Sequence, residues 1–405
     1  MGEAMSNQKP YQLIHADVID GLRQLKDSSV HCVMTSPPYW GLRDYGEAGQ
    51  IGLEPTPEAY LERMVEVFRE VRRVLRDDGT LWLNLGDSYA NKGSDGTYGA
   101  TAKVGNTKSG QQKTTNKIVS GLKTKDMCGI PWRVAFALQA DGWYLRSDII
   151  WHKSNPMPES VADRPTKGHE YIFLLTKRPR YYYDAEALRE AEMVPGATAR
   201  HIEYCKRNQQ RSDVKGDLVN NSKTWAGDGS SYKGGRNART VWTIPTQGYA
   251  DAHFSTFPEE LPRRCIGAGT SERGACPACG APWRRAVQVT YDAQGRTTNG
   301  PRSTERRHES PGRDERMVKN VATTGWSPSC ECAAAEPVPC TVLDPFAGSG
   351  TTLLVACRMG RRGLGIEMSE EYLRLAERRI GAGLKPQTYR YDEDGATNDE
   401  APLFL

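Results

Sequence analysis

The chain has 405 residues, and its 54 lysines and arginines against 50 aspartates and glutamates give a formal net charge of +4. Hydrophobic residues make up 38% and charged residues 26%, an ordinary globular composition that does not by itself favour a nucleic-acid partner. No run of 18 apolar residues occurs, so we expect no membrane span and no membrane partner. The first residues lack a secretory signal, and ten cysteines without one favour a reducing compartment, so we expect a cytoplasmic protein.

Strands and helices alternate over the first ninety residues, which predicts an α/β fold. The continuous apolar run at 30–35 is typical of a strand buried on both faces. The clearest helix covers 56–76, because Thr56 can cap it, Pro57 suits its first position and apolar residues recur on one face. The other elements expected here are strands at 11–17 and 80–85 and a short helix at 18–25.

Regular patterning is lost in three later segments and in the tail. Residues 92–125 are rich in Gly, Ser, Thr and Lys, which predicts a long loop, and 196–240 are again polar and basic. Residues 274–339 are predicted to form an insertion with clustered cysteines, and the acidic tail after 386 is predicted to be disordered. The expected elements between these segments are helices at 130–140, 262–270, 352–359 and 370–380, and strands at 143–151, 171–176, 342–344 and 363–367.

A glycine-rich turn joins the strand at 342–344 to the following helix. Gly348 and Gly350 would let the backbone approach a ligand closely, and Asp344 stands where open α/β sheets place binding groups. The acid precedes the glycines, which suits a cationic or hydroxyl-bearing ligand better than a pyrophosphate. Glu367 ends the next strand, a position from which a carboxylate can hold ribose hydroxyls. A turn needed only for strand and helix packing is the alternative.

A second turn, Ser36-Pro-Pro-Tyr39, follows directly on the buried strand at 30–35. Two prolines stiffen the turn and leave its carbonyl groups free to accept hydrogen bonds. The Ser36 hydroxyl adds an acceptor and Tyr39 a flat face, so the turn could hold an amino group attached to a planar base. A rigid turn with buried aromatic residues is the alternative.

Together the two turns resemble the motifs of the DNA methyltransferases that alkylate cytosine-N4 or adenine-N6. Ser36 to Tyr39 is similar to the family's catalytic motif, and Asp344 to Thr351 to its S-adenosylmethionine motif. The order, with the catalytic motif first, resembles the permuted class called β. The resemblance covers roughly residues 11–381, and it implies a doubly wound mixed α/β sheet of the Rossmann-like methyltransferase kind.

The resemblance also implies which residues do what. The catalytic residues would be Ser36, Pro37, Pro38 and Tyr39. An acidic residue upstream of the catalytic strand and the segment before the cofactor motif also border the cofactor in this family. The implied S-adenosylmethionine site comprises Asp17, Thr35, His253, Phe254, Ser255, Asp344, Pro345, Phe346, Gly348, Ser349, Gly350, Thr351 and Glu367.

The implied reaction is methyl transfer to the exocyclic amine of a base flipped out of double-stranded DNA. Ser36 Oγ and the Pro37 carbonyl would accept the two amine hydrogens and so favour a nitrogen with an available lone pair. Within the family, Ser before Pro-Pro is associated with cytosine-N4 and Asp with adenine-N6, so we favour cytosine-N4 and keep adenine-N6 as the alternative. Ring-carbon methylation needs a cysteine nucleophile; Cys340 precedes the cofactor strand instead of occupying the catalytic position, so we do not favour it.

Two cysteine pairs lie within the insertion. Cys276-Pro-Ala-Cys279 resembles a zinc knuckle, and Cys330-Glu-Cys332 could complete a tetrahedral four-cysteine site for structural zinc. Four reduced surface thiols are the alternative.

Positive charge is concentrated in three segments. Residues 92–125 carry a net charge of +6, 196–240 of +5 and 284–319 of +4, so the rest of the chain is at −11. Basic segments beside a base-modifying site suit phosphate contacts, whereas solvated loops without a partner are the alternative. The residues proposed to contact DNA are Trp40, Lys113, Lys117, Trp225, Tyr232, Arg236 and Arg239.

The expected organisation follows these motifs. The catalytic half of the methyltransferase covers 11–91 and 127–195, the basic loop 92–126, the candidate target-recognition region 196–245, the cofactor-binding half 246–273 and 340–382, the cysteine-rich insert 274–339 and the tail 383–405. Two other functions stay open: methylation of a non-DNA amine, and a zinc-bearing DNA-binding module that has lost activity. The sequence leaves the recognition sequence, a restriction partner and the oligomeric state undecided, with a homodimer among the options.

Overall fold

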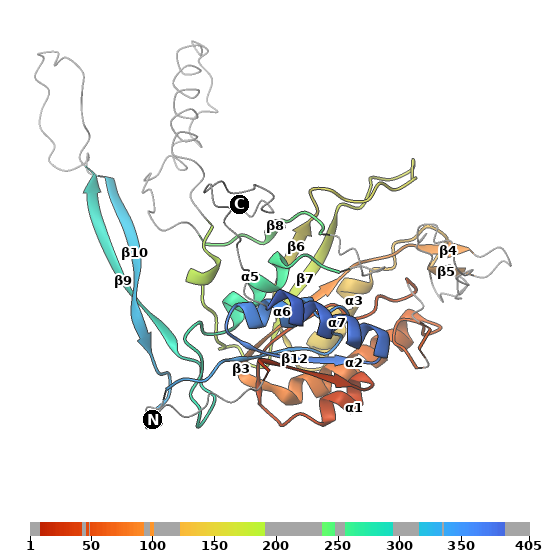
Figure 1. Ribbon diagram of the computed structural model, residues 1–405. Helices are drawn as coiled ribbons and strands as arrows, with labels where there is room; N and C mark the ends of the chain where they lie inside the picture. The colour runs from red at the N-terminus through yellow and green to blue at the C-terminus, as the bar shows by residue number, and fades with distance from the viewer. Residues whose placement is uncertain are drawn as a thin grey trace, which may run out of the picture.

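The computed structural model describes residues 9–42, 46–47, 49–92, 98–100, 122–190, 237–247, 256–294, 316–333 and 336–384. Eight strands of the described chain form one sheet, in the order β1-β12-β11-β2-β3-β7-β6-β8 (Figure 1). The strands of this sheet are β1 (Tyr11–His15), β2 (Val30–Thr35), β3 (Leu75–Leu85), β6 (Tyr144–His152), β7 (His169–Thr176), β8 (Val241–Thr243), β11 (Thr341–Asp344) and β12 (Arg362–Glu367). The expected α/β fold with a mixed sheet is thus confirmed.

The sheet divides into a parallel and a mixed part. Strands β1, β12, β11, β2 and β3 are all parallel, whereas β7 runs antiparallel to both β3 and β6. Carboxyl ends of β1, β12, β11, β2 and β3 therefore meet at one end of the sheet, here called its carboxyl end. The antiparallel β7 begins at that same end, because Tyr171 near its start pairs with Leu85 at the end of β3.

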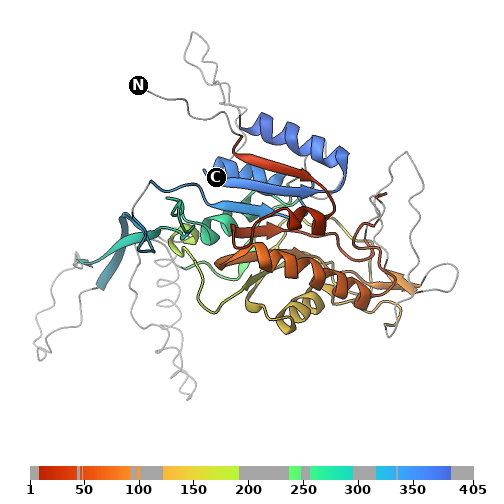
Figure 2. The ribbon, with the colours of Figure 1, turned by 90° about the horizontal axis from the view of Figure 1, so that it is seen from below.

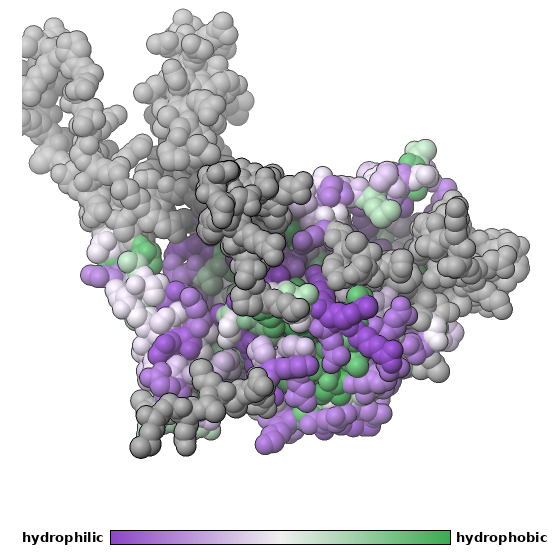
Figure 3. Space-filling view, viewed as in Figure 1, coloured by the Kyte–Doolittle hydropathy of each residue, from purple (hydrophilic) through white to green (hydrophobic). Residues whose placement is uncertain are grey.

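Helices cover both faces of the sheet (Figure 2). One face packs against α1 (Val18–Arg23), α2 (Pro57–Val74) and α3 (Ile130–Ala140), and the other against α5 (Glu260–Gly269), α6 (Thr351–Arg358) and α7 (Glu370–Gly383). Successive side chains of a strand point to opposite faces, so Val33 joins the first core and Met34 the second. The outward side of α7 carries hydrophilic side chains (Figure 3), while Leu375, Ala376 and Ile380 face inward.

Helix α2 largely follows its predicted course. The Thr56 side chain accepts a hydrogen bond from Ala59 N at 3.2 Å, and Pro57 occupies the first turn. The helix ends at Val74, two residues before the predicted end, because Leu75 turns extended and pairs with Val30. Strand β3 consequently begins five residues earlier than the predicted strand at 80–85.

Several elements escaped prediction. A hairpin of β9 (Arg284–Gln294) and β10 (Arg316–Ser327) extends from the body within the expected insertion (Figure 1). Strands β4 (Ala90–Lys92) and β5 (Tyr98–Ala100) pair where a loop was expected to begin, and η1 (Glu186–Leu188) is a short 3₁₀ turn. Most of the basic segment 196–240 and the acidic tail lie outside the described residues. Within the described part, every helix is too short or too polar to span a bilayer.

Replacing Phe68 by alanine should destabilise the fold strongly. Its side chain is fully buried between α2 and the sheet, so Phe68→Ala removes a large apolar group and leaves a cavity. We expect a loss of about 3–5 kcal/mol in the free energy of unfolding, measured by urea denaturation. Exposed Glu62 on the same helix provides the control, because Glu62→Ala should change stability by less than about 0.5 kcal/mol. Equal effects of the two variants would contradict this packing.

Candidate active site

The two motif turns lie side by side at the carboxyl end of the sheet. Strand β2 leads into Ser36 and β11 ends at Asp344, and the two strands pair in parallel. The Thr35 hydroxyl donates a hydrogen bond to Asp344 Oδ1 at 2.7 Å, with both side chains buried. Segments more than 300 residues apart are therefore joined by a direct contact.

Asp344 is almost fully enclosed. Its carboxylate also accepts hydrogen bonds from the Thr352 hydroxyl at 2.8 Å and from Phe346 N at 3.1 Å. Burial raises the pKa of Asp344 to about 7, although the three hydrogen bonds act in the opposite direction. The carboxylate thus fixes the beginning of the glycine turn and of α6, and Pro345 and Phe346 follow it in that turn.

The two glycines of the turn serve different purposes. Both have positive φ, +50° at Gly348 and +76° at Gly350. A Cβ at Gly350 would lie 3.0 Å from Ala376 Cβ, so this glycine lets α7 pack closely. A Cβ at Gly348 would meet, among the described atoms, only the Phe346 carbonyl oxygen at 3.9 Å. Packing therefore explains Gly350, whereas the open space beside Gly348 fits a ligand.

Hydroxyl groups in the same turn are held from α7. Arg379 donates to Ser349 Oγ at 2.8 Å and to Thr351 Oγ1 at 2.7 Å. A second nitrogen of this guanidinium lies 3.5 Å from Glu259 Oε1. Because Ser349 and Thr351 already bond Arg379, their side chains stabilise the turn.

Two further predicted acids stand beside this turn. Glu367 ends β12 and accepts hydrogen bonds from Gly348 N at 2.8 Å and Ser369 N at 2.9 Å. Burial raises the pKa of Glu367, while these backbone bonds oppose the rise. Asp17 follows β1, the neighbour of β12, and caps α1 by accepting from Ile19 N at 2.9 Å.

Helix α2 holds the Ser-Pro-Pro-Tyr turn in place. Tyr60 of α2 donates to the Pro38 carbonyl at 2.9 Å, which anchors the turn to the core. No described residue donates to the Pro37 carbonyl, which therefore keeps its acceptor capacity. Ser36 Oγ lies 3.1 Å from the Tyr39 hydroxyl, the next group in a chain of hydrogen bonds.

That chain of hydrogen bonds contains residues that sequence reasoning missed. The Tyr39 hydroxyl donates to Glu170 Oε2 at 2.8 Å, and Asn84 Nδ2 donates to the same oxygen at 3.1 Å. Lys153 Nζ lies 2.5 Å from the other oxygen, Oε1. Burial, followed by the nearby Glu170 charge, raises the pKa of Tyr39 well above its ordinary value. One local signal existed, since Asn84 is a polar residue inside an apolar strand.

The expected DNA contact of Trp40 is wrong. Its side chain is 1% exposed, packs in the core and donates its indole N–H to the Glu54 carbonyl at 3.0 Å. Arg239 is exposed before β8, and its guanidinium lies 3.2 Å from Glu190 Oε2. The other predicted contacts and part of the cofactor site lie outside the described residues: Lys113, Lys117, Trp225, Tyr232, Arg236, His253, Phe254 and Ser255.

The four predicted metal-binding cysteines come together, at the opposite end of the sheet. The Sγ atoms of Cys276, Cys279, Cys330 and Cys332 all lie within 4.8 Å of one another. Beside them, Arg76 donates to the Cys279 carbonyl at 2.8 Å, and His31 Nε2 lies 2.9 Å from the Gly280 carbonyl oxygen. His31 is five residues before Ser36 along β2, or about 16 Å of strand.

Cys340 lies at this same amino end. It is 1% exposed and immediately precedes β11, whereas Asp344 stands at the other end of that strand. Burial raises the pKa of Cys340 to about 11, so its thiol is protonated at neutral pH. This position and protonation state argue against a cysteine nucleophile for ring-carbon methylation.

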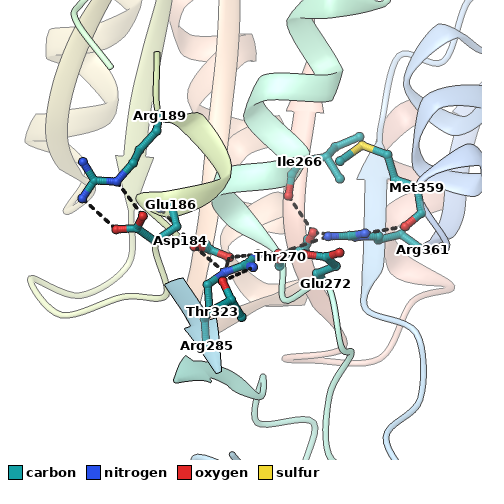
Figure 4. Close-up of polar contacts among 10 residues, drawn as sticks. All are labelled: Asp184, Glu186, Arg189, Ile266, Thr270, Glu272, Arg285, Thr323, Met359 and Arg361. Atoms are coloured by element: carbon teal, nitrogen blue, oxygen red, sulfur yellow. Dashed lines mark hydrogen bonds and ion pairs between the residues drawn. The ribbon is translucent and has the colours of Figure 1, made fainter. Parts of the chain in front are cut away.

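Ion pairs anchor the base of the β9–β10 hairpin (Figure 4). Arg285 of β9 reaches Asp184 Oδ2 at 2.9 Å and Glu272 Oε2 at 2.7 Å. Arg361, just before β12, donates to Thr270 Oγ1 at 3.0 Å in the same region. The cysteine cluster and the hairpin are thus docked on the amino end of the sheet, away from Ser36.

An open mixed sheet with these two joined turns at its carboxyl end has the architecture of a methyltransferase. The model of a family described as DNA methylase matches residues 30–276 and 339–378. The chain therefore belongs to the amino-methylating DNA methyltransferase family, whose members act at N6 or N4 amines.

Curated relatives match almost the whole chain. The type II methyltransferase M.SmaI of Serratia marcescens is 37% identical over 375 residues, covering 93% of this chain and 92% of that protein. M.Cfr9I of Citrobacter freundii is 37% identical over 383 residues, with the same coverages. M.XycI of Xanthomonas campestris pv. cyanopsidis is 39% identical over 368 residues, covering 91% of this chain and 87% of that protein.

The raised pKa of Asp344 predicts a pH-dependent contribution to stability. Between about pH 4 and 7 the folded state holds a proton that the unfolded chain releases, so stability falls as pH rises through this window. The amide side chain in Asp344→Asn cannot ionise, so this variant should lack the pH-dependent contribution of residue 344 to the free energy of unfolding. We expect the stability of the wild type relative to Asp344→Asn to be greater at pH 5 than at pH 8, by up to about 2.5 kcal/mol in urea unfolding. Parallel pH dependences of the two proteins would contradict the assignment.

Proposed function

We propose that this protein methylates the N4 amine of a cytosine within a specific sequence of double-stranded DNA, with S-adenosylmethionine as methyl donor. The observation that carries the proposal is the buried hydrogen bond between Thr35 and Asp344. It joins the turn that would hold the base to the turn that would hold the donor. Reaction between the two bound groups then depends chiefly on their proximity and orientation.

The residues at the carboxyl end fit S-adenosylmethionine. The open space beside Gly348 admits the donor against the backbone, and Glu367 at the end of β12 stands where ribose hydroxyls would be held. Asp17 and Thr35 would border the same site. When bound, this cofactor supplies an electrophilic methyl group on a sulfonium centre.

The Ser-Pro-Pro-Tyr turn prepares the amine. The exocyclic amine nitrogen of a base is a poor nucleophile because its lone pair is delocalised into the base ring. Ser36 Oγ and the Pro37 carbonyl accept the two amine hydrogens, which favours a pyramidal nitrogen whose lone pair points away from the ring. The half-buried ring of Tyr39 lies beside the flipped base.

Cytosine-N4 is preferred over adenine-N6 because serine stands before the two prolines. The family includes both activities, so the methylated nucleoside formed in the reaction identifies the target base. The intact arrangement of Ser36, Tyr39, Asp344 and Glu367 supports an active enzyme over an inactive DNA-binding module. The order of motifs, with Ser36 preceding Asp344 along the chain, supports assignment to the permuted β class.

Double-stranded DNA is the proposed substrate, and two properties of the chain support it. Type II methyltransferases are its relatives over nearly the full length. The segments 92–125, 196–240 and 284–319 carry the positive charge that phosphate contacts require. Residues 196–245 remain the proposed target-recognition region.

We further propose that the cysteine cluster holds a structural zinc ion. Tetrahedral Zn–S bonds of about 2.3 Å place sulfur atoms about 3.8 Å apart, and the four Sγ atoms here lie within 4.8 Å of one another. Four thiolates would close the coordination sphere. Because the cluster lies at the amino end of β2, the ion would stabilise the insert and take no part in chemistry.

Loss of the Ser36 hydroxyl should abolish most activity. Ser36→Ala removes one of the two amine acceptors, so we expect methyl transfer to duplex DNA to slow by about 10²-fold or more. The wild-type product should be N4-methylcytosine in nucleoside mass spectrometry. Ser29→Ala, at the amino end of the same strand, is the matched control and should retain activity. N6-methyladenine as product would overturn the choice of base, and absence of any transfer would favour the inactive module.

Zinc should depend on the four cysteines. Protein purified without chelators should contain one zinc ion per chain by elemental analysis, and Cys279→Ser should contain almost none because three thiolates bind zinc less tightly. Cys357→Ser, in α6 and outside the cluster, should keep its zinc. A wild-type protein that contains no zinc, or a zinc-replete Cys279→Ser variant, would contradict the site.

A further inference from the structure

Glu170 lies at the start of β7, outside both motifs, yet its carboxylate is fully engaged. Its side chain is 16% exposed, and Oε1 lies 2.5 Å from Lys153 Nζ. The other oxygen, Oε2, accepts from the Tyr39 hydroxyl at 2.8 Å and from Asn84 Nδ2 at 3.1 Å. Residues of β3 and β7 and the residue that directly follows β6 therefore converge on one carboxylate beside the catalytic turn.

The direction of these hydrogen bonds follows from counting protons. A carboxylate paired with a lysine has no hydrogen to donate, so the Tyr39 hydroxyl must give its only proton to Glu170. The Tyr39 oxygen can then accept only from Ser36, 3.1 Å away. Ser36 in turn directs its only proton toward Tyr39 and leaves its lone pairs facing outward.

We infer that Glu170 is a positioning residue that makes Ser36 a pure hydrogen-bond acceptor for the target amine. An amine presents two hydrogens, whereas a freely rotating serine hydroxyl presents a hydrogen in part of its orientations. Such orientations would oppose base binding and the pyramidal nitrogen. The charge of Glu170, transmitted through the Tyr39 hydroxyl, removes them before the base arrives.

Surrounding residues hold in place this relay, the hydrogen bonds that connect Glu170 through the Tyr39 hydroxyl to Ser36. Asn84 also donates to the Tyr171 carbonyl at 3.1 Å, so its amide group is fixed with nitrogen toward Glu170. Its own oxygen is 3.3 Å from the Tyr39 hydroxyl, a longer and uncharged alternative to the carboxylate. Gly86 leaves room for the ring, because a Cβ there would lie 2.7 Å from Tyr39 Cε2.

The inference rests on the proposed function and is tested by a double-mutant cycle. Tyr39→Phe keeps the ring and removes the relay, whereas Glu170→Gln keeps the shape and removes the charge. Each should slow single-turnover methyl transfer about tenfold, the effect of one misdirected hydrogen bond, with Kd values for cofactor and DNA changed less than about twofold. The double variant should be no slower than either single variant, because Glu170 acts through the Tyr39 hydroxyl.

Tyr171→Phe is the matched control, since it removes a tyrosine hydroxyl from β7 and leaves the Tyr171 carbonyl in place. It should retain the wild-type rate, and all variants should unfold within a few degrees of the wild type. A wild-type rate for Glu170→Gln, or single effects that multiply in the double variant, would overturn the relay. Wild-type protein that transfers no methyl group to DNA would instead refute the proposed function, before any variant is compared.

Discussion

The buried hydrogen bond from Thr35 to Asp344 is the contact on which the rest of the site depends. It exists because β2 and β11 pair in parallel with one defined register, in which Val342 faces Cys32 and Leu343 faces Val33. A slip of one residue would turn Thr35 to the other face of the sheet and break the bond. Burial on both faces opposes such a slip, because every residue of β2 is enclosed. The core that fixes the register therefore also aligns the two functional turns.

The features that the sequence could predict are those marked by patterns of neighbouring residues. The two turns, the capped helix α2 and most strands each leave a pattern within a dozen residues. Glu170, Asn84 and Lys153 leave almost none, because they lie in or directly after three different strands that meet only in the folded sheet. The DNA contact predicted for Trp40 is wrong because the fold places its indole in the core, where it donates to the Glu54 carbonyl.

The two ends of β2 have different tasks. At its amino end His31 contacts the Gly280 carbonyl of the cysteine cluster, and just beyond its carboxyl end Ser36 faces the site. Burial lowers the pKa of His31 to about 4, so its ring is neutral near pH 7 and accepts a hydrogen bond from Thr341 N at 3.0 Å. This histidine links the cluster to both central strands. The insert is thus attached to the rigid centre of the sheet, where it can project the β9–β10 hairpin without disturbing the chemistry.

Charge is distributed unevenly between the residues around the site and the basic segments of the sequence. Cations around the described site are paired within the fold, as Lys153 is with Glu170 and Arg379 with Glu259. Such pairs neutralise the cations locally and contribute little to the long-range field of the protein. The excess positive charge lies instead in the segments 92–125, 196–240 and 284–319, outside the acidic scaffold. A net charge of +4 therefore conceals an uneven distribution, because it averages an acidic scaffold with three basic segments.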